Sequence, residues 1–253
     1  MTEERVGLNS GPFQLTGKLL VPDHASEKPL PGLIYCCGFP GSEQHILRIA
    51  KALSHGGYSV LSLNYRGFRE SEGEVDFASQ VDDVKAGLTY LETRMEVNRE
   101  LIGIVGHSAG GALAIGTAAQ DLRIKAVAVW GALGNYELFL KFLLSLHGNL
   151  MMRLDTWLCR REYRGKNIID QMKSILSQNV SPLDDVGEIS PRPLLIIHQR
   201  NDFSMPAQHA YDLYERAGDP KKLVIVEGRN HSVTDGMIKL TIDWFNCIFR
   251  HKQ

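Results

Sequence analysis

The sequence has no excess of charge of either sign. Its 253 residues contain 28 Lys and Arg against 29 Asp and Glu, which gives a formal net charge of −1. A dedicated nucleic-acid binder normally carries a basic excess that neutralises phosphates, so we expect no nucleic-acid partner. Hydrophobic residues make up 43% and charged residues 23% of the chain, which excludes a disordered or collagen-like protein.

Cysteine is also scarce. The four cysteines, Cys36, Cys37, Cys159 and Cys247, are too few and too scattered for a disulfide framework or a zinc site. Adjacent Cys36 and Cys37 would point to opposite faces of a strand, which makes them poor joint metal ligands. We therefore expect reduced, mostly buried thiols and no bound metal.

Long hydrophobic runs are missing as well. No uninterrupted apolar run approaches the ~20 residues of a membrane span. Residues 1–10 have neither the basic nor the apolar region of a secretory signal. These features predict a cytoplasmic protein without a membrane span. The sequence has no internal repeat or linker-like run, and we expect a single α/β domain over residues 1–253.

Strand and helix patterns alternate along most of the chain. Residues 6–21 contain two apolar stretches separated by a turn-rich segment, which predicts an antiparallel hairpin at a sheet edge. Short apolar runs predict strands at 32–37, 58–64, 101–105, 126–130, 194–198 and 223–227, and periodic patterns predict helices at 43–55, 76–95, 109–119, 207–217 and 233–249. This alternation is typical of a mostly parallel sheet with helices on both faces, whose ligands bind at the carboxyl ends of the strands.

Residues 131–190 interrupt the alternation. They lack a convincing strand and contain helical patterns at 136–146, 150–161 and 168–177. Because so long a connection needs structure of its own, we interpret the segment as a helical lid over the strand ends. Residues 138–146 are too apolar for a freely solvated helix, and three interpretations are open: the lining of an acyl pocket, a homodimer surface, or packing on the body.

Basic residues cluster in the same segment, at Arg160, Arg161, Arg164 and Lys166. Such a run is usually a solvated face, and binding of an anionic substrate group is the alternative. No feature of the sequence identifies the substrate.

The sequence Gly106-His107-Ser108-Ala109-Gly110 follows the strand predicted at 101–105 and precedes a helix rich in small residues. This is the G-x-S-x-G pattern in the strand, turn and helix context that it requires. The serine would sit on a strained turn that projects its hydroxyl away from the sheet, and larger side chains two positions away would collide with that turn. We therefore expect Ser108 to be a nucleophile.

A serine hydroxyl needs a base to accept its proton, and the base needs a third group to orient it. In this arrangement the order along the chain is Ser, then Asp or Glu, then His. Asp202 follows the strand at 194–198, and His231 follows the strand at 223–227. We therefore predict a catalytic triad of Ser108, Asp202 and His231.

Each of these residues has an alternative interpretation. Asp202 could be a helix cap, and His231 could be a surface loop histidine. The rivals for the base are His198, His209 and His45, and the rivals for the acid are Asp184, Asp185 and Asp235. The rival histidines fall on a strand or within predicted helices. The rival acids lie in the insertion or after His231, so both sets suit the expected order less well.

The oxyanion of a tetrahedral intermediate needs backbone N–H donors. One should be the N–H of Ala109, at the start of a helix whose dipole favours negative charge. The second should come from the loop after an early strand, which reads Cys36-Cys37-Gly38-Phe39-Pro40-Gly41. Because proline has no N–H, Phe39 is the better candidate. A glycine-rich turn without a catalytic role is the alternative.

These motifs, together with Tyr65-Arg66-Gly67, Asn201-Asp202 and Asn230-His231, resemble the α/β-hydrolase superfamily. The resemblance is to its dienelactone hydrolase-like, small serine esterase and peptidase-domain branches, and covers nearly the whole chain outside 131–190. It implies the α/β-hydrolase fold, the triad Ser108, Asp202 and His231, and an oxyanion hole formed by Phe39 and Ala109. The sequence departs from the family in two places: Cys37 replaces the usual histidine of the oxyanion loop, and Arg69 stands where relatives often have glycine.

The sequence thus predicts a serine hydrolase that cleaves small or medium carboxylic esters through an acyl-enzyme, without a metal or cofactor. The alternatives within the same fold are a peptidase, an amidase or an acyltransferase. A non-catalytic binding protein that kept the fold is the alternative of another class.

Overall fold

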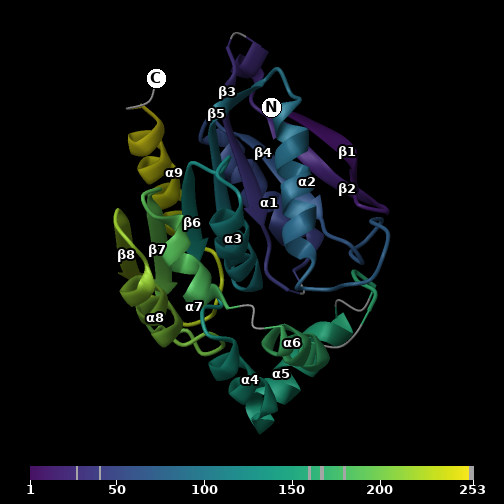
Figure 1. The fold of residues 1–253 in the computed structure, drawn as a ribbon, viewed down its shortest axis with the longest axis vertical. Coiled ribbons are helices and arrows are strands. Elements are labelled where there is room, and N and C mark those ends of the chain that lie inside the picture. The colour runs from purple at the N-terminus through teal and green to yellow at the C-terminus, as the bar shows by residue number, and fades with distance from the viewer. Residues whose placement is uncertain (27, 40, 159–160, 166–167, 179–180, 251–253) are drawn as a thin grey trace.

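An eight-stranded sheet forms the centre of the molecule (Figure 1). The computed structural model describes residues 1–26, 28–39, 41–158, 161–165, 168–178 and 181–250. The strands are β1 (Thr2–Ser10), β2 (Phe13–Val21), β3 (Leu30–Cys36), β4 (Ser59–Asn64), β5 (Val97–His107), β6 (Ala126–Trp130), β7 (Leu194–Gln199) and β8 (Lys221–Val226), in the spatial order β1-β2-β4-β3-β5-β6-β7-β8. The β2 strand pairs antiparallel with β1 and β4, and the other neighbours are parallel. The predicted edge hairpin and mostly parallel α/β sheet are confirmed.

Helices cover both faces of the sheet. They are α1 (Glu43–His55), α2 (Gln80–Glu92), α3 (Ala109–Gln120), α4 (Tyr136–Leu144), α5 (Leu146–Leu158), α6 (Ile168–Ser177), α7 (Pro182–Asp185), α8 (Gln208–Arg216) and α9 (Asp235–Arg250), with short 3-10 turns at Asp23–Ser26 and Val186–Ile189. From β3 to β4 the chain moves across the sheet toward the β1 edge, and from β4 to β5 and β6 it moves toward the β8 edge. Right-handed crossovers therefore place α1 on one face and α2 and α3 on the other. The α9 helix contacts α1, and α3 contacts α2.

The helix predicted at 76–95 is shorter than the sequence pattern indicated. The α2 helix begins only at Gln80, because Asp76 and Ser79 form a turn in which the Ser79 hydroxyl donates to the Asp76 carboxylate. Such local side-chain bonds compete with a helical backbone. Phe77 consequently lies outside the helix, where its ring packs against that of Phe39 with centroids 5.2 Å apart.

Segment 131–190 folds into helices α4 to α7, and α4, α5 and α6 gather at one end of the molecule (bottom of Figure 1). Phe139 and Leu143 of α4 are buried in a cluster with α6 residues and with Ala112, Leu133 and Met205 of the body. Part of the apolar 138–146 stretch therefore packs on the body. Leu144 and Leu146 are exposed.

The segment Glu162–Gly165 is bound to the loop 67–75 by backbone hydrogen bonds. The Arg69 N–H donates to the Glu162 carbonyl at 2.8 Å, and the Arg164 N–H donates to the Gly67 carbonyl at 2.7 Å. The Arg164 guanidinium also donates to the carbonyl of Arg69. Of the basic run, Arg164 thus binds backbone rather than forming a purely solvated face, while Arg160 and Lys166, like Cys159, lie outside the described residues.

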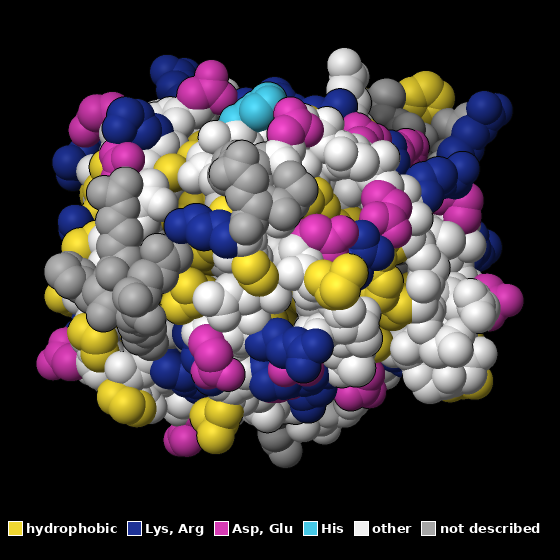
Figure 2. All heavy atoms as spheres, turned by 90° about the horizontal axis from the view of Figure 1, so that it is seen from above, with side chains coloured by type: hydrophobic (Ala, Val, Ile, Leu, Met, Phe, Trp, Pro, Cys, Tyr) yellow, Lys and Arg dark blue, Asp and Glu magenta, His cyan; other side chains and the backbone are white. Residues whose placement is uncertain are grey.

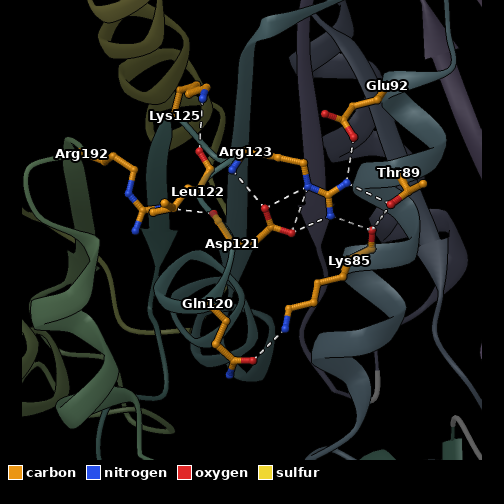
Figure 3. A network of polar contacts seen from close by, with 9 residues as sticks. All are labelled: Lys85, Thr89, Glu92, Gln120, Asp121, Leu122, Arg123, Lys125 and Arg192. Atoms are coloured by element: carbon orange, nitrogen blue, oxygen red, sulfur yellow. Dashed lines mark hydrogen bonds and ion pairs between the residues drawn. The ribbon is translucent and has the colours of Figure 1, made fainter.

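Charged side chains of both signs form local networks. Figure 2 shows acidic and basic side chains interspersed on the end of the molecule opposite α4 to α6. In Figure 3, Arg123 donates to Asp121, Glu92 and Thr89, which joins the α3–β6 connection to α2. Among the described cysteines, Cys36 and Cys37 are buried and Cys247 is exposed, which agrees with the expectation of mostly buried thiols. No helix in the described ranges is long and apolar enough to cross a membrane.

Candidate active site

Ser108 occupies a strained turn between β5 and α3. Its φ of 57° and ψ of −123° lie in a region that L-residues rarely adopt. A Cβ on Gly106 would lie 2.3 Å from the carbonyl oxygen of Gly110, and a Cβ on Gly110 would lie 2.2 Å from the carbonyl oxygen of Cys36. The turn therefore requires glycine at both positions, for the steric reason expected from the sequence.

The backbone of Ser108 is held by the chain that follows β6. The Ser108 N–H donates to the Trp130 carbonyl at 3.0 Å, and the Leu133 N–H donates to the Ser108 carbonyl at 3.0 Å. Gly131 lies between these two partners. A Cβ on Gly131 would lie 3.1 Å from Cε1 of His231, so the serine and this histidine lie beside the same short segment.

Asp202 and His231 are in direct contact. Nδ1 of His231 lies 2.6 Å from Oδ2 of Asp202, and the backbone N–H groups of Ser204 and Met205 donate to Oδ1 of Asp202 at 3.0 and 2.9 Å. Burial raises the pKa of Asp202, but the bond with His231 and the two backbone bonds outweigh it and hold the pKa below its usual value. The carboxylate is therefore ionised and can hold the imidazole in one orientation.

The other nitrogen of His231 is available for proton transfer. Nε2 of His231 is buried and has no hydrogen-bond partner among the described residues. No hydrogen bond joins it to the Ser108 hydroxyl in the described chain. In enzymes without substrate such catalytic hydrogen bonds are often long and shorten when the substrate binds.

Gln199, at the end of β7, fixes the loop that carries His231. Its Oε1 accepts from the Asn230 N–H at 3.0 Å, and its Nε2 donates to the Ser232 carbonyl at 2.9 Å. Sequence reasoning missed this residue. The available signal was a polar amide at the end of an apolar strand, where a buried side chain must find partners.

The rival residues occupy other positions. Nε2 of His198 lies 2.7 Å from the Met205 carbonyl, and His209 accepts from the Asn135 N–H through Nδ1 at 3.0 Å. Asp184 pairs with Arg216, and Asp235 pairs with Arg48. His45 lies on α1 and Asp185 on α7. None of these six makes the contact that joins Asp202 and His231.

The loop after β3 lies against Ser108. A Cβ on Gly38 would be 2.9 Å from Cβ of Ser108, which makes glycine necessary for this approach. Phe39 follows, and no hydrogen bond within the described residues uses its N–H or that of Ala109. Both predicted oxyanion donors are therefore free to bind a ligand. Pro40 lies outside the described residues.

Arg69 braces this loop with a side chain that is 6% exposed. Its guanidinium donates to the Gly41 carbonyl at 2.8 Å and to Oδ1 of Asn64 at 3.1 Å, and its Nε lies 2.8 Å from Oε2 of Glu162. Arg69 thus joins the oxyanion loop to both the body and the 162–165 segment. Cys37 is buried, which raises its pKa to about 11 and keeps it a neutral thiol. The sequence identified both departures but not this bracing.

A cavity of about 70 Å³ lies between α2, α3 and α4, and its lining includes Ala109, the residue after Ser108. Across the described ranges, no group of three or more His, Cys, Asp or Glu side chains could hold a metal ion. The arrangement thus combines a serine on a strained turn, an imidazole oriented by Asp202 and the backbone N–H of Ala109 beside a cavity. These are the elements of acyl transfer.

Comparisons with known proteins show which proteins the chain is similar to. A family model described as BD-FAE matches residues 32–136, which include Phe39, Ser108 and Ala109. The uncharacterized protein YfhR of Escherichia coli O157:H7 is 26% identical over 208 residues, which are 81% of this chain and 64% of YfhR. The chain thus spans slightly less than two thirds of that relative. The thiohydrolase aneE of Aspergillus aculeatus is 22% identical over 267 residues, 87% of this chain and 83% of aneE.

Solved structures share the fold over almost the whole chain. Est1E of Butyrivibrio proteoclasticus with bound ferulic acid superposes with a TM-score of 0.75 at 21% identity, covering 97% of this chain and 98% of that chain. Because the alignment with Est1E covers 97% of this chain, it extends across both the body and segment 131–190. On these grounds, the chain has the α/β-hydrolase fold that these solved structures share.

Proposed function

We propose that the protein is a serine hydrolase that cleaves carboxylic esters through an acyl-enzyme. The observation that carries this proposal is the 2.6 Å contact between Asp202 and His231 beside the strained turn of Ser108. A positive φ at a serine is costly, and such strain is concentrated at functional sites. A histidine fixed by an ionised carboxylate supplies the base that the hydroxyl requires.

In the proposed reaction, Oγ of Ser108 attacks the ester carbonyl carbon while Nε2 of His231 takes the hydroxyl proton. The N–H groups of Phe39 and Ala109 bind the oxyanion, and Asp202 stabilises the imidazolium. When the carbonyl re-forms, the alcohol leaves with the proton from His231. Water then attacks the acyl-enzyme by the same steps, which releases the acid and restores Ser108.

The comparisons support hydrolysis of an acyl substrate. The name of aneE describes a thiohydrolase, and Est1E was solved with ferulic acid, a carboxylic acid. Both fit an enzyme that forms an acyl intermediate, in which esters and thioesters differ only in the leaving group. The ester is our primary substrate class. Amides and peptides, which have poorer leaving groups, are the runner-up.

A fluorophosphonate probe tests the nucleophile first. We expect the wild-type protein to be labelled, and the Ser108→Ala variant to be folded but unlabelled. Turnover of 4-nitrophenyl esters, acyl thioesters and aminoacyl amides then ranks the substrate classes. Equal ester hydrolysis by the wild type and Ser108→Ala would refute the mechanism, and a folded wild type that is never labelled would favour a binding protein.

A further inference from the structure

The cavity of about 70 Å³ begins at Ala109, the residue that follows Ser108. Three residues at this end join it to the site: Ala109 follows the nucleophile, Leu133 donates its N–H to the Ser108 carbonyl, and Phe77 packs on Phe39. The volume of about 70 Å³ admits about five water molecules. The cavity is therefore large enough for a short acyl chain.

One face of α3 forms the floor of the cavity. Ala109, Ala112, Gly116 and Gln120 follow one another at helical spacing and all line it. At 1.5 Å per residue, Gly116 lies about 10 Å along the helix from Ala109. The walls between these ends are mostly apolar and comprise Phe77, Val81, Leu113, Leu133, Met172 and Ile175, together with Tyr136 of α4.

The far end of the cavity is polar. A Cβ on Gly116 would lie 3.3 Å from Oδ2 of Asp185 and 3.8 Å from Cγ2 of Val81, so α7 and the start of α2 meet over this glycine. No side-chain hydrogen bond or ion pair of Asp185 occurs among the described residues. Burial raises the pKa of Asp185, and the nearby Asp184 and Glu188 add to the rise.

Gln80 precedes Val81 and also lines the cavity. Its side chain is 6% exposed, and its amide nitrogen has no hydrogen-bond partner within the described chain. A buried amide without a partner is unfavourable, because it has lost water and gained nothing in exchange. Gln120, at the same end, is already engaged by Lys85 (Figure 3).

We propose that this cavity binds an acyl group of about 10 Å that ends in a hydroxyl, and that Gln80 and Asp185 select that hydroxyl. A hydroxyl can accept a hydrogen bond from the Gln80 amide and donate one to the Asp185 carboxyl group. A methyl end would leave both groups without partners. This proposal rests on the ester hydrolysis proposed above, and it names the acyl class.

Turnover tests the preference directly. The substrates are ethyl esters of straight-chain acids of about four to eight carbons and their terminally hydroxylated counterparts, followed by titration of the released acid. At the best length we expect kcat/KM to favour the hydroxy ester by about fivefold, the worth of one neutral hydrogen bond. Gln80→Met should abolish this ratio without lowering the Tm. Gln208→Met, which alters an exposed glutamine outside the cavity, should keep it.

Binding separates this proposal from the proposed function. In the Ser108→Ala protein, calorimetry should find that the hydroxy acid binds more tightly than the unsubstituted acid, and that Gln80→Met removes the difference. If no ester is turned over but this difference persists, the hydrolase proposal fails and the cavity assignment stands. If esters are hydrolysed with equal preference for both ends, or an amino-terminated ester is preferred to the hydroxy ester, the cavity assignment is overturned.

Discussion

Gln199 binds the peptide groups on both sides of His231. The distances are 3.0 Å to the Asn230 nitrogen and 2.9 Å to the Ser232 oxygen, and Gln199 is 2% exposed. His231 itself has a φ of 54°, a conformation that costs energy for a residue with a side chain. One buried amide thus stabilises the strained backbone that carries the imidazole bound to Asp202.

Replacing Gln199 should weaken catalysis without touching the reacting groups. Gln199→Leu has a similar volume but leaves the Asn230 N–H and the Ser232 carbonyl unpaired, so we expect kcat to fall by about 100-fold. Gln199→Glu keeps the acceptor for the Asn230 N–H, so its kcat should lie between the kcat of the wild type and that of Gln199→Leu. Steady-state kinetics at neutral pH measures this order. Unchanged kcat in Gln199→Leu would show that the loop that carries His231 keeps its shape without the bonds from Gln199.

Asp202→Asn should remove the charge that orients His231. Because an amide can hold the wrong tautomer and cannot stabilise the imidazolium, we expect kcat to fall by about 10⁴-fold. Asp184→Asn is the matched control, since Asp184 is exposed and pairs with Arg216 away from His231. If both variants lose activity equally, Asp202 does not have the proposed role.

Ser108→Gly should be more stable than Ser108→Ala, although both should be inactive. Glycine adopts the φ of 57° without the steric strain that a Cβ causes. After the entropy that glycine loses on folding, we expect an advantage of about 1 kcal/mol. Urea unfolding of the two variants measures the difference, and a more stable alanine variant would contradict strain at the nucleophile.

Arg69→Met should disturb the oxyanion loop. It removes the contacts to the Gly41 carbonyl, Asn64 and Glu162, and we expect kcat/KM to fall by about 10- to 100-fold. Arg69→Lys should recover only part of the kcat/KM that Arg69→Met loses, because an ammonium cannot reproduce the planar fork of the guanidinium. Glu162→Gln cuts only the contact to the 162–165 segment. An equal loss in that variant would assign the effect to the segment rather than to the loop.

Stability should fall as the pH is lowered from about 6.5 to 4. Burial, with a smaller contribution from His198, lowers the pKa of His209 to about 4. In the unfolded chain His209 takes up a proton as the pH falls through its ordinary pKa of 6.5. In the folded protein His209 stays neutral until about pH 4. The loss reaches about 3 kcal/mol over this window and stops below it.

His209→Asn isolates that contribution. The asparagine oxygen can accept from the Asn135 N–H as Nδ1 of His209 does, but it does not titrate. Between pH 6 and 5 we expect the slope of unfolding free energy with pH to decrease by about 1.4 kcal/mol per unit relative to the wild type. Identical slopes would mean that His209 is protonated in the folded protein.

Local features were the most predictable. The α1 helix spans Glu43–His55 as the periodicity indicated, since Ser42 caps its start and Gly56 follows its end. The predicted start of the α2 helix was wrong, because Asp76 and Ser79 bond to each other in a turn. Hydrophobic periodicity does not reveal such a side-chain bond. The short α7 helix carries no periodicity to detect.

The mostly parallel α/β sheet and the nucleophile turn could be predicted from the sequence, because strand alternation and the steric need for Gly106 beside Gly110 act between near neighbours. The sequence could name Asp202 and His231 only by their order along the chain. The 2.6 Å contact between them, the bracing by Gln199 and Arg69, and the cavity that Gln80 and Asp185 both line depend on the tertiary structure. Those contacts join segments far apart in sequence, and their distances depend on how whole helices and strands pack.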